Sequence, residues 1–413
     1  MKYYRCAGAA LFIGLLLILQ SCDSTASPKE DAEPLSGIWR GLISLNDSVD
    51  LPFNFELNYA DSVYTVIFHN AEERLKASEV IDTGDSLRIQ MPVFATYLVA
   101  AKAADRLEGV FVNPDAKDYQ LPFVAEYGDS LRFKVSDDNC CDINRKWRVA
   151  LSPDTDEEDP AIAYFDQVGN RVNATFLTQY GDWRYLEGVL DGDMLKLSAF
   201  NGGSLYYLEG KLEGQRIQGL RYSGRSFMEP WTAWRDQDFS LPNPDTMTYL
   251  REGYEGISFA FPDLSGDTLT DKDLAGKPVI ITIMGSWCPN CMDEARHLTD
   301  LYNAYHDQGL EVVGLTFERT ASREQSGARA MKMVEDLDIP YPVLLAGATR
   351  DDRAGDALPM LNHVMSFPTT IYLNRNHEVV RIHTGFNGPG TPMYEDFIAS
   401  NTSFVEKELI DNQ

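Results

Sequence analysis

The stretch Lys277-Pro-Val-Ile-Ile-Thr-Ile-Met-Gly-Ser-Trp-Cys-Pro-Asn-Cys291 decides the fold of the last part of the chain. It opens with a continuous apolar run, which is typical of a strand buried on both faces of a sheet. Two cysteines follow, and Pro289 between them suits the first position of a helix, where the missing N–H costs nothing. The stretch therefore predicts a buried strand that leads into a dithiol at the N-terminus of a helix.

The residues after Cys291 continue the pattern of an α/β domain. Apolar side chains recur on one helical face over 293–307, and Gly309 ends that helix. Residues 310–317 form a second buried strand, so the unit is β-α-β. We expect the domain to be completed by a helix over 322–336, a strand over 341–345, a hairpin over 369–382 and a closing helix over 393–410.

The two cysteines at this spacing favour redox chemistry. Backbone N–H groups at a helix N-terminus stabilise a thiolate at Cys288, and Cys291 lies one turn deeper, where it can attack a mixed disulfide on Cys288. A lone C-x-x-C could also be half of a zinc site, but a second cysteine pair at ligand spacing is missing. The sequence predicts a redox disulfide Cys288–Cys291, with no metal and no cofactor.

Residues 257–413 resemble the thioredoxin superfamily, and within it the TlpA-like thiol–disulfide oxidoreductases of the bacterial envelope. The resemblance rests on Trp287-Cys-Pro-Asn-Cys291 after a strand, on Glu294, and on Phe367-Pro-Thr-Thr370 before the late hairpin. It implies an enzyme with a cis-proline at Pro368. It also implies a set of substrate-binding residues, namely Trp287, Pro289, Phe367, Pro368 and Thr369.

One position departs from the thioredoxin pattern. Thioredoxins carry a buried Asp six residues before the first cysteine, and this chain has Thr282 there. The TlpA-like group instead carries a Glu that Glu294 matches, which implies that Glu294 accepts the proton of Cys291. The alternative is a first-turn Glu that the helix dipole favours. Asp293 and Glu318 are weaker candidates for the same task.

The N-terminus has the pattern of an export signal. Lys2 and Arg5 precede an apolar run of 14 residues, which is too short to span a bilayer. The run ends in Leu19-Gln-Ser-Cys22, which resembles a lipobox. We expect residues 1–21 to be a lipoprotein signal peptide, Cys22 to be lipidated and 22–35 to be a tether; an ordinary secretory signal or an uncleaved anchor is the alternative. The predicted location is the bacterial envelope, lipid-anchored and facing the periplasm, with the inner or outer membrane left open.

The middle of the chain alternates at the period of β-strands and repeats itself at an offset of 108 residues, with Trp39-Arg40 matching Trp147-Arg148. We therefore expect two related antiparallel β-modules, over 36–135 and 143–236. The opening Gly37-x-Trp-x-Gly41 resembles lipocalin- or avidin-type barrels, so each module is expected to be such a barrel or a sandwich. The chain as a whole is then multi-domain, with β-modules followed by the α/β thioredoxin-like domain.

Composition excludes one class of partner. The chain has 36 Lys plus Arg against 63 Asp plus Glu, a net charge of −27, so nucleic acid is not expected to bind. The expected partners are disulfide-bearing or dithiol proteins of the envelope and a membrane electron donor. A ligand-binding or adhesive lipoprotein with an auxiliary redox domain is a rival, and so is a thiol peroxidase, although Met284-Gly-Ser-Trp287 lacks the Pro and Thr of a peroxidatic site. Cys140 and Cys141 are either free thiols or redox partners of a group elsewhere, since adjacent cysteines bond to each other only through a strained ring.

The predicted lipobox gives a direct test. Cys22→Ala removes the atom that would receive the lipid, so the protein should leave the membrane fraction and become soluble in the envelope. Fractionation of detergent-free extracts measures this, and unchanged membrane association of the variant would contradict it.

Overall fold

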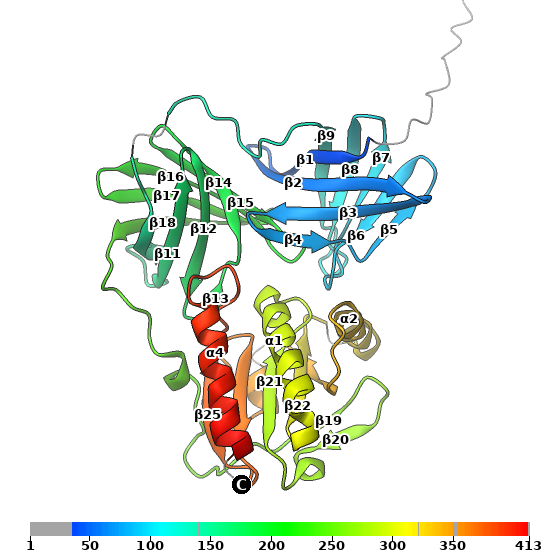
Figure 1. Cartoon of the computed structure of the whole chain (residues 1–413), viewed down its shortest axis with the longest axis vertical. Coiled ribbons are helices and arrows are strands. Elements are labelled where there is room, and N and C mark those ends of the chain that lie inside the picture. Colours follow the sequence, from blue (N-terminus) through cyan, green and yellow to red (C-terminus); the bar gives the residue numbers. More distant parts are fainter. Residues whose placement is uncertain (1–34, 139–140, 321, 350–352, 412–413) are drawn as a thin grey trace, which may run out of the picture.

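The computed structural model describes residues 35–138, 141–320, 322–349 and 353–411. Two antiparallel β-modules come first, and a C-terminal α/β domain with a thioredoxin-like fold follows (Figure 1). The predicted signal peptide, Cys22 and Cys140 lie outside the described residues. Within those residues, no helix is long and apolar enough to cross a membrane.

The first β-module is a nine-stranded sheet in the order β4-β3-β2-β1-β9-β8-β7-β6-β5. Buried and less buried residues alternate along β3, because successive side chains of a strand point to opposite faces. The strands are β1 (Gly37–Asn46), β2 (Val49–Ala60), β3 (Val63–Asn70), β4 (Glu73–Lys76), β5 (Glu79–Asp82), β6 (Ser86–Gln90), β7 (Tyr97–Lys102), β8 (Arg106–Val112) and β9 (Gln120–Tyr127).

The second β-module closes on itself, because β11 pairs with β10 on one side and with β12 on the other. Its interior is filled by large side chains: the rings of Phe176 and Trp231 lie 5.5 Å apart, and Trp147 is fully buried. The strands are β10 (Arg145–Leu151), β11 (Asp159–Val168), β12 (Arg171–Thr178), β13 (Gly181–Asp182), β14 (Leu186–Asp191), β15 (Met194–Phe200), β16 (Leu205–Glu213), β17 (Arg216–Ser223) and β18 (Phe227–Arg235).

The strand pairing repeats at the same offset as the sequence. Trp39 of β1 pairs with Phe55 of β2 and with Tyr127 of β9, and both partners of Trp147 in β10 lie 108 residues further along the chain. Each of the two indole N–H groups donates to the carbonyl oxygen of the residue four positions earlier, at 2.9 Å. The two modules therefore share the register of their first strands.

The C-terminal domain is a five-stranded sheet in the order β23-β22-β21-β24-β25, with β21, β22 and β23 parallel. A short hairpin, β19 and β20, precedes it. The closing helix predicted over 393–410 is α4 followed by a π-helical segment. The elements are η1 (Pro244–Thr246), β19 (Ala260–Pro262), β20 (Thr268–Thr270), η2 (Asp271–Leu274), β21 (Val279–Met284), α1 (Pro289–Tyr305), η3 (His306–Gln308), β22 (Glu311–Glu318), α2 (Arg323–Asp336), β23 (Val343–Ala348), α3 (Arg353–Ala357), β24 (Thr369–Leu373), β25 (Val379–Thr384), α4 (Tyr394–Phe404) and η5 (Val405–Asp411).

A buried charge cluster joins all three parts of the chain. Arg184, just after β13, forms ion pairs with Glu73 of β4 and, at 3.1 Å, with Asp293 of α1. All three side chains are almost wholly buried. Burial raises the pKa of Asp293 to about 7, against the opposing effect of the Arg184 charge. The guanidinium therefore sets the position of α1 relative to both β-modules.

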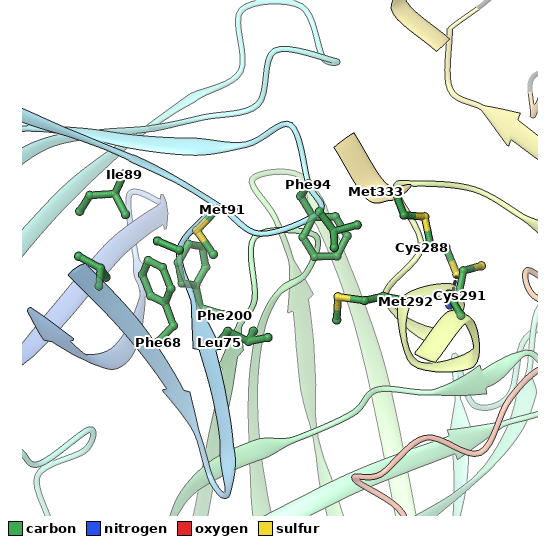
Figure 2. Packing of buried hydrophobic residues seen from close by; sticks show 14 of the residues in the cluster. Phe68, Leu75, Ile89, Met91, Phe94, Phe200, Cys288, Cys291, Met292 and Met333 are labelled. Atoms are coloured by element: carbon green, nitrogen blue, oxygen red, sulfur yellow. Dashed lines mark hydrogen bonds between the residues drawn. The ribbon is translucent and has the colours of Figure 1, made fainter. Parts of the chain in front are cut away.

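The first module also contacts the C-terminal domain directly. Asp336 at the end of α2 accepts hydrogen bonds from the backbone N–H of Val93 at 2.6 Å and the hydroxyl of Ser78 at 2.8 Å. Figure 2 follows one buried cluster from Met91 past Phe94 to Met292 of α1, beside the two cysteines. Hydrogen bonds and apolar packing thus hold this domain against the first module.

The buried cluster predicts a large effect of a single charge removal. Arg184→Met should destabilise the folded chain by about 3–5 kcal/mol, because it removes the buried cation that pairs with Glu73 and leaves Asp293 with Arg296 alone. Thermal or urea unfolding of the full chain measures this. The matched control is Arg106→Met, since Arg106 forms only exposed ion pairs and its loss should cost below about 1 kcal/mol. Equal effects of the two substitutions would show that the cluster contributes no special stability.

Candidate active site

Cys288 occupies the N-cap of α1, directly after β21 and a short turn. Its Sγ accepts a hydrogen bond from the backbone N–H of Cys291 at 3.2 Å and lies 3.2 Å from the carbonyl oxygen of Phe367, to which the thiol can donate. Pro289 is in the first turn of the helix, as its fixed φ allows. The N-terminus of α1 therefore presents N–H groups and the positive end of its dipole to the sulfur of Cys288.

The two thiols have different surroundings. Cys288 is 4% exposed to solvent, whereas Cys291, inside the first turn of α1, is 1% exposed. Burial raises the pKa of the Cys291 thiol well above its usual value, and the nearby charges of Cys288 and Glu294 raise it further. The two thiols therefore differ in the groups that face them, and burial favours the protonated form of Cys291.

The remaining residues predicted to bind substrate gather around Cys288. The Phe367–Pro368 peptide bond is cis, and the ring of Phe367 lies 5.2 Å from that of Trp287. The indole N–H of Trp287 donates to the carbonyl oxygen of Phe317 at 2.9 Å, which fixes the ring. Thr369 is fully buried, and its hydroxyl donates to the carbonyl oxygen of Ser366, so it supports the cis-proline loop from below.

Glu294 is buried below the dithiol, where two hydroxyl groups hold its carboxylate. Thr282 of β21 donates to Glu294 Oε2 at 2.5 Å, and Thr370 of β24 donates to Oε1. Burial raises the pKa of Glu294 to about 7, although both hydrogen bonds act in the opposite direction. Thr282, the residue that departs from the thioredoxin pattern, therefore serves as a donor to the carboxylate that α1 supplies.

The other two acidic candidates have structural partners. Asp293 is engaged in the buried cluster with Arg184 and forms an ion pair with Arg296 at 3.1 Å. Glu318 accepts hydrogen bonds from the N–H and hydroxyl of Ser286 at 3.0 and 2.7 Å, so it fixes the turn before Cys288. Among the residues the structure describes, no group of three His, Cys, Asp or Glu side chains could hold a metal ion.

Sequence analysis missed a cation beside the dithiol. The guanidinium of Arg319 lies 4.5 Å from the ring centroid of Trp287, and its charge interacts favourably with the thiolate of Cys288. Arg319 follows directly after β22, so the only sequence signal for it was its position at the carboxyl end of a central strand. In parallel sheets that end is where functional groups collect.

The second β-module also reaches the dithiol, which the sequence did not indicate. Asp182 accepts hydrogen bonds from the side-chain amide of Asn290 at 3.1 Å and from the N–H of Gly388 at 2.7 Å. The hydroxyl of Ser366 donates to the carbonyl oxygen of Tyr180 at 2.5 Å. A cleft of about 700 Å³ lies over Cys288, and all three parts of the chain line it.

Comparison with known proteins gives the same domain. The AhpC/TSA family matches residues 253–382. The thiol-disulfide oxidoreductase ResA of Halalkalibacterium halodurans is 28% identical over 149 residues, which cover 36% of this chain and 76% of that protein. ResA of Geobacillus kaustophilus is 30% identical over 139 residues, 33% of this chain and 72% of the relative. A solved structure, a putative thiol:disulfide interchange protein DsbE from Chlorobium tepidum, aligns with 22% identity and a TM-score of 0.28 over 37% of this chain and 99% of its own.

A thioredoxin-type sheet with a dithiol at the N-terminus of α1 and a cis-proline beside it defines a protein that exchanges thiols and disulfides. Through its C-terminal domain, the chain belongs to the thioredoxin superfamily, as a TlpA-like thiol–disulfide oxidoreductase. The resemblance on which the sequence analysis relied is confirmed.

Proposed function

We propose that this protein is an envelope thiol–disulfide oxidoreductase that reduces disulfides of partner proteins with its Cys288–Cys291 pair. The observation that carries the proposal is the inequality of the two thiols. Cys288 sits at the end of α1, where N–H groups face its sulfur, while burial raises the pKa of the Cys291 thiol one turn inside. That inequality suits a nucleophile and a resolving thiol, respectively.

The proposed reaction has two exchanges. The Cys288 thiolate attacks one sulfur of the partner's disulfide, forming a mixed disulfide and releasing the partner's other sulfur as a thiolate. Cys291 then attacks Cys288, which forms the Cys288–Cys291 disulfide and releases the partner as a dithiol. Two electrons pass from this protein to the partner. A membrane electron donor of unknown identity would restore the reduced pair.

Glu294 is the proposed proton acceptor in the second exchange. Cys291 must lose its proton to attack, and burial makes that loss unfavourable without a neighbouring base. The Glu294 carboxylate lies close enough for its charge to act on Cys291, and its own pKa of about 7 suits proton transfer near neutral pH. The hydroxyls of Thr282 and Thr370 keep it in place.

Residues around Cys288 complete the proposed substrate site. The surface on which a partner's cysteine would lie is formed or supported by Trp287, Pro289, Phe367, Pro368 and Thr369. Arg319 would stabilise the thiolate.

We further propose that Cys22 carries lipid and anchors the protein in the bacterial envelope, facing the periplasm. The packed interior of the second module favours an oxidoreductase over a ligand-binding protein built on a lipocalin- or avidin-like barrel. The stretch Met284-Gly-Ser-Trp287 lacks the Pro and Thr of a peroxidatic site, which favours an oxidoreductase over a thiol peroxidase.

Trapping of partners tests the order of the two cysteines. In cells, Cys291→Ser should accumulate mixed disulfides on Cys288, because the first exchange proceeds and the second cannot. Cys288→Ser should accumulate none and lose disulfide reduction. Non-reducing gels followed by mass spectrometry identify the adducts. Adducts formed predominantly by Cys288→Ser through Cys291 would reverse the assignment.

The pH dependence of partner release tests Glu294. Its carboxylate is deprotonated above pH 7, so the rate of the second exchange should rise as pH increases through about 7. Glu294→Gln should remove that rise and slow release by about 10²-fold, the usual size of a general-base contribution, while the first exchange stays at its normal rate. Stopped-flow measurement of release from a preformed mixed disulfide separates the steps. The control, Glu324→Gln on α2, changes an exposed carboxyl group and should leave both steps unaltered.

Stability against pH gives the same substitution a second readout. The pKa of Glu294 is raised on folding from 4.5 to about 7, so the folded protein binds more protons than the unfolded chain between these values. Stability contributed by this group therefore falls as pH rises across that window. Glu294→Gln should flatten this dependence, and a variant that retained both it and the rate profile would exclude Glu294 as the base.

A further inference from the structure

The cleft over Cys288 is lined by three different parts of the chain. Cys288, Trp287 and residues 365–367, just before the cis-proline, line it from the C-terminal domain. Trp183 and Tyr206 line it from the second β-module, and the loop containing Ala116 lines it from the first. Its volume of about 700 Å³ falls in the range of pockets that enclose a drug-sized ligand, and it is far too small for a folded domain.

The wall from the second module is fixed against the active site on two sides. Asp182 holds Asn290 of the Cys-Pro-Asn-Cys motif, and the carbonyl oxygen of Tyr180 accepts from Ser366, which precedes the cis-proline loop. Gly181, between these anchors, has a φ of +136°, and a Cβ there would lie 3.2 Å from the Asn290 side chain. Residues 180–184 therefore pack tightly onto the dithiol turn, and the positive φ at Gly181 disfavours any side chain there.

The aromatic surface of this wall is also rigid. The ring of Trp183 stacks on that of Phe176 with centroids 4.7 Å apart. The guanidinium of Arg221 lies 4.3 Å from the Trp183 centroid and forms an ion pair with Glu229 at 2.7 Å. The stack joins the cleft wall to the packed interior of the second module. Substrates must therefore fit a preformed space, because these side chains are held by their own partners.

From this geometry we propose that the β-modules select the substrate: the protein reduces disulfides carried on extended polypeptide segments and excludes those on the surfaces of folded domains. The inference rests on the oxidoreductase function proposed above. A flat protein surface cannot bring a disulfide to Cys288, because this residue is only 4% exposed and the cleft that it lines has walls from all three parts of the chain. A single extended segment can enter the space between the walls.

The cleft suits an extended segment for a second reason. Successive side chains of an extended chain point in opposite directions. When a cysteine of the segment faces Cys288, its sequence neighbours point away from that cysteine. In the proposal these neighbours contact Trp183 and Tyr206 of the second module, which line the same cleft. Aromatic rings bind many side chains with little demand on their identity, so the cleft would accept unfolded segments of varied sequence.

The chemical step is the two-exchange reduction already described, so no additional oxidant or reductant is needed. The segment's disulfide receives two electrons from the Cys288–Cys291 dithiol and leaves as two thiols. The β-modules determine only which disulfides can reach Cys288. The proposal can therefore be tested in a single turnover with the prereduced full-length protein.

Three probes with one leaving group separate access from chemistry. They are 5,5′-dithiobis(2-nitrobenzoate), a linear ten-residue peptide with a single cysteine bonded to thionitrobenzoate, and a folded helical domain with the same disulfide on an exposed cysteine. Each rate of thionitrobenzoate release is divided by the rate with dithiothreitol. We expect the normalised rate for the peptide to exceed that for the folded domain by about 10²-fold, the usual cost when a reacting group cannot reach its position.

A matched pair of variants tests the cleft itself. Ala116→Trp adds bulk to the module loop that lines the cleft, and Lys117→Trp adds the same bulk to its exposed neighbour. Ala116→Trp should lower the peptide rate by about tenfold or more, the size of effect that pocket contacts have, and leave the small disulfide almost unaffected. Lys117→Trp should change neither rate. Circular dichroism and thermal unfolding verify that both variants fold.

Equal normalised rates for the peptide and the folded domain would overturn the proposal while leaving the oxidoreductase function intact. A rapid reaction with the small disulfide alone would also overturn it, since the cleft would then admit only small molecules. Equal effects of Ala116→Trp and Lys117→Trp would show that the module loop does not control access. No reaction with any probe would refute the oxidoreductase function on which the proposal depends.

Discussion

The arrangement of the molecule depends on one buried guanidinium. Arg184 belongs to the second β-module, yet its ion-pair partners are Glu73 in the first module and Asp293 in the first turns of α1. A charge removed from water is tolerated only when opposite charges surround it, so these three groups cannot separate without a large cost. The same contact that holds the parts together therefore fixes the helix that carries the dithiol.

The redox chemistry arises from the end of that helix. One turn of α1 separates two identical side chains into different environments: Cys288 at the N-cap faces N–H groups, and Cys291 is enclosed by apolar neighbours. The two thiols therefore differ without any change of residue type, because N–H groups face one sulfur and burial raises the pKa of the other. Glu294, on the same helix, accepts hydrogen bonds from hydroxyls of β21 and β24, so the sheet and the helix together fix the position of its carboxyl group.

The β-modules change what this catalytic unit can meet. An isolated thioredoxin-like domain would present Cys288, Trp287 and the cis-proline loop on an open surface. Here the loop over 180–184 and the aromatic wall at Trp183 stand over that surface, and they are tied to it by Asp182 and Ser366. Two modules that share a strand register thus have different positions in the molecule: the second contacts the dithiol turn, while the first packs mainly against α2 and α1.

Local patterns in the sequence determined the elements and the place of the two cysteines at the start of α1. Forces between residues close in the chain explain three of these patterns: the apolar run before Cys288, the proline at the start of α1 and the period-two alternation of the modules. The repeat of Trp39 at Trp147 corresponds to the same strand register in both modules. The tertiary structure alone decided the cation at Arg319, the partners of Glu294 and the cleft with its buried anchor at Arg184. These contacts join residues far apart in the sequence, and a single Arg or Thr in a strand or turn has the same local pattern whether it faces water or a buried carboxylate. Only the folded chain, which forces each buried polar group to find a partner, distinguishes the two.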